Sequence, residues 1–225
     1  MAHKQPPLTP TNPSTTWRGA FKAYQPSKAV VKFNLSTILT LTVLSILAGM
    51  IPSLFDDRSA DGVITYTPLG AMIEAIFFVV GIFLAIALTL TILAGIKRKK
   101  LSAESAVKQS YSYALSYFGM ALVSTLLLAI SLVAFIIPFF FVAPRIALAQ
   151  YFLIDKKMGP IESIKASWHA TKGHATKVWG IIGATLVMSL PILTIIGIPF
   201  AIYFLFMYSA AMVLLYAHLT RQKAQ

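Results

Sequence analysis

Two charged residues inside long apolar stretches are the first candidates for chemistry in this sequence. Glu74 and Arg145 each lie within such a stretch, whereas the other charged residues fall between or outside them. A lone charge in hydrocarbon costs roughly 2.5–3.5 kcal/mol on insertion scales, so each needs a partner or water. Their expected depths differ by only a few ångströms at the rise of a helix. We therefore predict a Glu74–Arg145 ion pair that holds two helices together.

Two other arrangements of these charges stay open. Glu74 can reach toward the membrane surface, which leaves Arg145 for a lipid phosphate or another anion. Alternatively, the two residues form a coupled site for an ion or a proton.

Patterns typical of enzymes and metal sites are missing from the sequence. His169 and His174 are five residues apart, which on a helix turns them to different faces. No Ser-His-Asp set, catalytic carboxylate pair, phosphate loop or HExxH motif stands out, and the seven acidic residues fall mostly in expected loops. We expect no catalytic residues, no metal and no cofactor.

The composition indicates an integral membrane protein. Hydrophobic residues make up 57% of the chain and charged residues only 12%. A net charge of +12 at pH 7 is explained by the lysines and arginines that orient membrane proteins, so we expect no nucleic-acid partner. The chain has no cysteine, which excludes disulfides and thiolate metal sites.

Apolar runs of roughly 20 residues predict an all-α membrane fold with about six transmembrane helices in hairpins. Residues 1–25 are polar and rich in proline, so they are expected to form a disordered cytoplasmic tail before a single membrane domain at 26–225. The expected spans are residues 35–51, 70–96, 115–137, 139–154, 178–198 and 199–219.

Short amphipathic helices are expected between some of these spans, at residues 102–114 and 160–172. Pro160 can open the second helix and Gly173 can end it. Ile161, Ile164 and Trp168 form its apolar stripe, and the far face carries Ser163, Ala166 and Ala170. Such a helix should lie along the bilayer surface with its lysines directed outward. Residues 26–34 form a shorter surface-seeking segment.

The distribution of cations predicts the orientation. With six spans, 17 of the 19 lysines and arginines fall on the side of the N-terminal tail; only Arg58 falls opposite, and Arg145 is within a span. Both termini and the surface helices should therefore face the cytoplasm at the plasma membrane. The residues expected to contact lipid headgroups, here called the collar, are Lys97, Arg98, Lys99, Lys100, Lys156, Lys157, Lys165, Trp168, Lys172 and Trp179.

An internal repeat links the two surface helices. Residues 99–111 align without a gap with residues 156–168, so that two adjacent lysines, a later lysine and a serine recur. Ile137-Pro138-Phe139 recurs as Ile198-Pro199-Phe200. We predict repeat units at about 26–98, 99–155 and 156–223, of which the first is the loosest. Repeated membrane units often build a site at their interface.

The second unit also carries a family resemblance. It contains Arg145, Asp155 after an apolar run, and Gly159-Pro160, followed by Ser163-Ile164-Lys165, Ser167-Trp168, Thr171 and Gly173. This resembles the membrane domain found with glycerophosphoryl diester phosphodiesterases and in related six-span bacterial membrane proteins of unknown function. The resemblance implies a membrane module with Arg145 and the 159–173 helix as its characteristic features. It implies no catalytic activity, which in that family belongs to a separate soluble barrel.

We therefore expect a non-enzymatic module that anchors, scaffolds or associates with lipids. Its expected partners are membrane lipids, with anionic headgroups preferred, and no protein partner or oligomeric state follows from the sequence. The alternative is a small transporter or channel with a path between the repeats, near Glu74 and Arg145.

Overall fold

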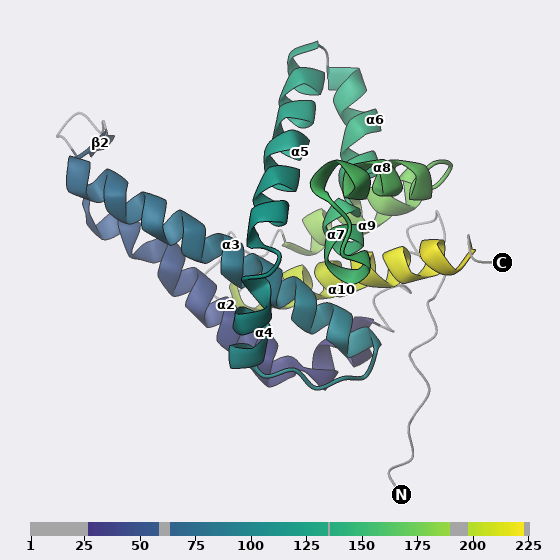
Figure 1. Ribbon diagram of the computed structural model, residues 1–225, viewed down its shortest axis with the longest axis horizontal. Coiled ribbons are helices and arrows are strands. Elements are labelled where there is room, and N and C mark those ends of the chain that lie inside the picture. Colours follow the sequence, from purple (N-terminus) through teal and green to yellow (C-terminus); the bar gives the residue numbers. More distant parts are fainter. Residues whose placement is uncertain (1–26, 59–63, 135, 190–197, 223–225) are drawn as a thin grey trace, which may run out of the picture.

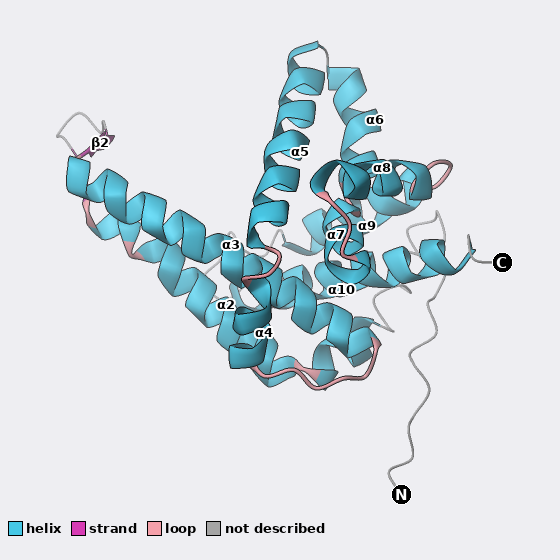
Figure 2. Ribbon diagram, in the orientation of Figure 1, coloured by secondary structure: helices cyan, strands magenta, loops and turns pink. Residues whose placement is uncertain are grey.

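The computed structural model describes residues 27–58, 64–134, 136–189 and 198–222. These residues are helical apart from short connections and one pair of three-residue strands (Figure 2). The predicted all-α class is confirmed in this sense. The predicted tail at 1–25 lies outside the described residues.

The first hairpin consists of α2 (Leu35–Met50) and α3 (Pro68–Ile96). The turn at its tip holds a 3₁₀ turn at Pro52–Leu54 and strands β1 (Asp56–Arg58) and β2 (Ile64–Tyr66), which pair antiparallel. Thr67 caps α3 by accepting a hydrogen bond from the Gly70 N–H. The helix Ser27–Phe33 precedes α2 and is bent away from it by 81°.

The second hairpin consists of α5 (Ala114–Ala134) and α6 (Ile136–Ile146), and α4 (Ala103–Ser110) precedes it. After α6 come α7 (Ala149–Lys156) and α8 (Pro160–Ala170), and the chain ends with α9 (Ala175–Ser189) and α10 (Ile198–Gln222). The two hairpins leave the body of the molecule in different directions, and α10 crosses beneath the second (Figure 1).

Among the described residues, α3 and α5 are long and apolar enough to cross a membrane, and the bent pair Ser27–Phe33 and α2 adds a third crossing if it forms one span. At about 1.5 Å per residue, α5 matches a hydrocarbon core of ~30 Å. Shorter apolar stretches lie at Ala175–Val187 and Leu205–Thr220.

The fourth predicted span is not one helix. Residues 139–154 are divided between α6 and α7 by a turn at Ala147 and Leu148. Pro144, inside α6, has no N–H to donate to the helix, and the helical ladder ends two residues later at Ile146. An apolar run alone does not reveal such a break.

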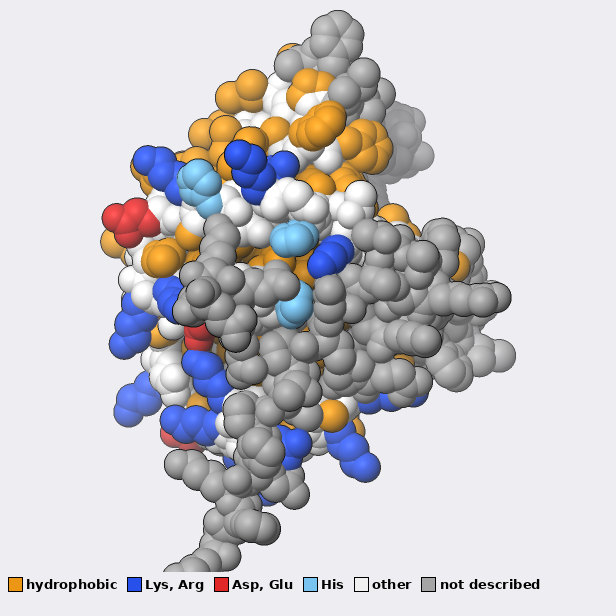
Figure 3. Space-filling view, turned by 90° about the vertical axis from the view of Figure 1, so that its right-hand side faces the viewer, with side chains coloured by type: hydrophobic (Ala, Val, Ile, Leu, Met, Phe, Trp, Pro, Cys, Tyr) orange, Lys and Arg blue, Asp and Glu red, His pale blue; other side chains and the backbone are white. Residues whose placement is uncertain are grey.

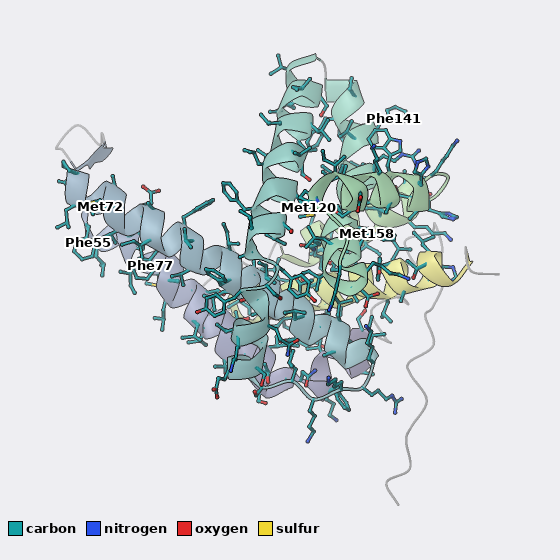
Figure 4. All side chains as sticks on the ribbon, viewed as in Figure 1. Phe55, Met72, Phe77, Met120, Phe141 and Met158 are labelled. Atoms are coloured by element: carbon teal, nitrogen blue, oxygen red, sulfur yellow. The ribbon has the colours of Figure 1, made fainter. Side chains whose placement is uncertain are left out.

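The core lies where α7 and α10 meet the other helices. Leu153 of α7 and Met207 and Leu215 of α10 are almost fully buried. Small residues at Ala210 and Ala211 allow close packing around α10. Met120 of α5 is buried in the same cluster, and Met158, before α8, packs against it (Figure 4).

Helices form within both segments predicted to be surface helices, although α4 ends at Ser110 and α8 buries a different face from the expected one. Pro160 opens α8, and Gly173 adopts the left-handed backbone (φ 81°) that a glycine tolerates. Ile164 is buried as a core residue, whereas Ile161 and Trp168 are exposed. The buried face is otherwise small and polar, with Ser163, Ser167, Ala170 and Thr171.

Two pairs of corresponding positions in the predicted repeat have the same exposure. Ser110 and Ser167 are both fully buried, and Tyr111 and Trp168 are both exposed. Asn34, which follows the helix Ser27–Phe33, is likewise a buried polar residue. The duplication itself stays a prediction.

Candidate functional site

The structure does not form the predicted Glu74–Arg145 ion pair. Glu74 is exposed on α3, and no ion pair joins it to Arg145. Arg145 is half-buried at the end of α6, in the other hairpin (Figure 1). Equal depth in a membrane does not bring two residues together when their hairpins diverge, which is why the prediction was wrong.

Arg145 instead lies at the break between α6 and α7, where α8 and α9 satisfy the freed backbone groups. The Ser167 hydroxyl donates to the Arg145 carbonyl at 2.6 Å and accepts from the Leu148 N–H at 3.2 Å. Because Pro144 has no N–H, the Phe140 carbonyl lacks its helical donor, and the Trp179 indole N–H donates to it at 3.1 Å. The break is therefore held by side chains from two later helices.

One nitrogen of the Arg145 guanidinium is buried without a partner. Its Nη1 atom is buried and has no hydrogen-bond partner among the described residues. The Cζ atom lies 6.0 Å from the centre of the Trp168 ring, at the outer limit of a cation–π contact. A buried donor without an acceptor costs about 1–3 kcal/mol.

Most of the collar is exposed. The side chains of Lys97, Lys99, Lys100, Lys156, Lys157, Lys165, Trp168 and Lys172 are exposed, and those of Arg98 and Trp179 are half-buried. One face of the molecule shows basic side chains below an apolar region (Figure 3). The apolar region lies toward the end of the molecule occupied by the α5–α6 turn.

A cluster of polar side chains joins three helices at the basic end, and the sequence reasoning missed it as a site. Asp155 of α7 accepts from Lys97 Nζ at 2.5 Å and from the Tyr216 hydroxyl of α10 at 2.8 Å. Lys97 directly follows α3. The available signal was a lone aspartate placed immediately before the cationic pair Lys156 and Lys157.

Among the residues that the structure describes, the histidines do not gather into a metal site. No group of three or more His, Cys, Asp or Glu side chains among the described residues could hold a metal ion. His169 is exposed on α8. His174 lies in the α8–α9 connection, where partial burial and then the Lys177 cation lower its pKa.

Comparison with protein-family models, curated proteins and solved structures finds no match for this chain. The resemblance to the phosphodiesterase-associated membrane domain therefore stays a prediction based on the motif from Arg145 to Gly173.

Proposed function

We propose that this protein is a non-enzymatic membrane module that recognises anionic lipids at the cytoplasmic surface of the plasma membrane. In this proposal the chain crosses the bilayer about six times, both termini are cytoplasmic, and the hairpins arose by duplication. The module anchors or organises its surroundings through lipid contacts.

The separation of exposed apolar and exposed basic side chains carries the proposal. Leu47 and Met50 of α2, Met72 of α3 and Val133 of α5 are largely exposed toward the tips of the hairpins (Figure 4 labels Met72). The exposed lysines lie at the C-terminal ends of α3 and α7, at the other end of the molecule from these hairpin tips. Large exposed apolar patches mark membrane contact, and lysines beside them attract anionic headgroups.

Arg145 supports a lipid role more than a transport role. Its buried Nη1 atom has donor capacity that a phosphate oxygen could use. The alternative is a transporter or channel with a path between the repeats near Glu74 and Arg145, and no ion pair joins these two side chains.

Lipid preference tests the function directly. The full chain, purified in neutral detergent, is titrated with phosphatidylglycerol or with phosphatidylcholine, and its thermal unfolding is followed by circular dichroism. A ligand at 100 times its Kd stabilises by ~2.7 kcal/mol. We expect the anionic lipid to raise the unfolding temperature by several degrees more than the zwitterionic lipid. An equal response to both lipids would refute the proposal.

Solute flux separates this function from transport. Liposomes containing the full chain are loaded with a panel of ions and small solutes, and we expect no flux above that of empty liposomes. A flux that Arg145→Ala abolishes would favour the transporter and overturn the scaffold function.

The topology can be tested because the natural chain contains no cysteine. A single cysteine at Asp57 or at Ser102 is labelled in intact cells with a membrane-impermeant maleimide. We expect Asp57→Cys to react from outside and Ser102→Cys only after the membrane is permeabilised. Labelling of both from the same side would contradict a crossing by α3.

A further inference from the structure

An open groove of about 250 Å³ lies at the basic end of the molecule. It is bounded by the end of α3, the end of α7 and the α4–α5 connection. Its floor is apolar, with Leu90, Leu93, Ala94 and Ile154, and its rim is cationic, with Lys97, Lys99 and Lys157. Gln109 and Tyr113 add polar groups at the side of α4.

The charges of the groove leave an excess of two positive charges. Asp155 is its one carboxylate, and both carboxylate oxygens are already occupied, one by Lys97 and the other by the Tyr216 hydroxyl. Lys99 and Lys157 have exposed side chains and no ion-pair partner among the described residues. Two unneutralised lysines around an apolar floor complement a ligand with an anionic head and an apolar body.

Left-handed backbone residues present both of these lysines. Arg98, directly before Lys99, and Lys157 itself both adopt left-handed conformations, with φ of 51° and 52°. Such conformations are uncommon for residues other than glycine and persist only when the surroundings determine them. At the turn around Arg98, the Asn34 side chain holds the backbone. Its Nδ2 donates to the Lys99 carbonyl at 3.1 Å, and its Oδ1 accepts from the Leu101 N–H at 3.3 Å.

We propose that this groove binds the headgroup of one anionic phospholipid. The phosphate lies between Lys99 and Lys157, and the glycerol and the first acyl carbons lie along the apolar floor. This inference rests on the proposed membrane function and adds to it one specific lipid-binding site, here called the seat. The groove lies at the basic end of both hairpins, which is where the proposed orientation places lipid phosphates.

A pair of matched double variants tests the seat. Lys99→Gln/Lys157→Gln removes the two unpaired lysines of the groove. Lys100→Gln/Lys156→Gln removes their sequence neighbours, which are also exposed but lie outside the lining. Short-chain phosphatidylglycerol is titrated into each full-length protein in neutral detergent by calorimetry. Each of the two lysines is expected to contribute the binding free energy typical of a lysine near a lipid phosphate. Their joint removal in the groove variant should therefore raise the Kd about thirtyfold. The control variant should raise it less than about threefold.

The outcomes separate the seat from the general lipid function. Equal losses in the two variants would show a diffuse collar and overturn the seat, while the preference for anionic lipid stands. A wild-type protein that does not distinguish phosphatidylglycerol from phosphatidylcholine would overturn the proposed function as well. Binding of glycerol phosphate as tight as that of the lipid would identify a soluble phosphate ligand and overturn the lipid assignment.

Discussion

Replacement of Tyr216 by phenylalanine tests the polar cluster that holds the basic end together. The substitution keeps the buried ring, which packs edge-on against Phe152 at 4.8 Å, and removes only the hydroxyl. That hydroxyl donates to Asp155 Oδ2 at 2.8 Å and thereby ties α10 to the end of α7. The change therefore isolates one hydrogen bond to a carboxylate.

The expected loss follows from the environment of that bond. A hydrogen bond to a charged group contributes about 1.5–3 kcal/mol. The Asp155 side chain is 16% exposed, so water can replace part of the lost donor, and we expect a loss of about 2 kcal/mol. For a chain of this size this corresponds to a fall in unfolding temperature of about 4–8 °C. Lys97→Gln should cost at most about 1 kcal/mol because the Lys97 side chain is 64% exposed.

Thermal unfolding of the full chain in neutral detergent, followed by circular dichroism, measures both losses. Tyr111→Phe is the matched control, since Tyr111 is 64% exposed and its ring contact with Phe83 survives the change. We expect it to leave the unfolding temperature unchanged. Equal losses for Tyr216→Phe and Tyr111→Phe, or a larger loss for Lys97→Gln than for Tyr216→Phe, would refute the reasoning.

Three further predictions use the same assay. Gly95→Ala should destabilise the protein by up to about 2 kcal/mol because the new Cβ would lie 2.8 Å from the Val30 carbonyl oxygen. Gly81→Ala, where the Cβ meets open space, should stabilise the protein by up to about 1 kcal/mol. A gain in stability for both variants would show that the helix Ser27–Phe33 is not packed on α3. Arg145→Met should leave the protein about 1–3 kcal/mol more stable without lipid and reduce the stabilisation by phosphatidylglycerol, and a large loss of stability would reveal a structural partner. The pKa of His174 is lowered in the folded state, so at acid pH the unfolded chain binds more protons than the folded chain. The stability should therefore decrease as the pH drops below about 6.5, and His174→Gln should reduce this decrease. An unchanged pH profile in the variant would contradict this reasoning.

The helices themselves were predictable from apolar runs and cationic stops. The first two long runs became α2 and α3, with boundaries close to those expected, because Pro52 and the cations from Lys97 onward end them. Proline and glycine also predicted the ends of α8. These signals are local, and each acts within a few residues of where it stands.

Relations between helices were not predictable in the same way. Depth along the membrane axis is a one-dimensional quantity, and it suggested that Glu74 and Arg145 would meet. Their separation depends on the directions of two hairpins, which packing around α7 and α10 determines. Asp155 illustrates the same limit, since its partners Lys97 and Tyr216 lie 58 and 61 residues away.

The buried face of α8 shows how one break in a helix organises its neighbours. The break after α6 leaves a carbonyl at Arg145 and an N–H at Leu148 without helical partners, and a buried polar group of this kind needs a partner. Ser167 serves both, so α8 must turn its polar face inward. Ile161 and Trp168 then face outward as the apolar surface that a membrane interface would accept. This arrangement brings the Arg145 guanidinium beside Trp168, with Cζ 6.0 Å from the ring centre, while its buried Nη1 atom has no hydrogen-bond partner among the described residues.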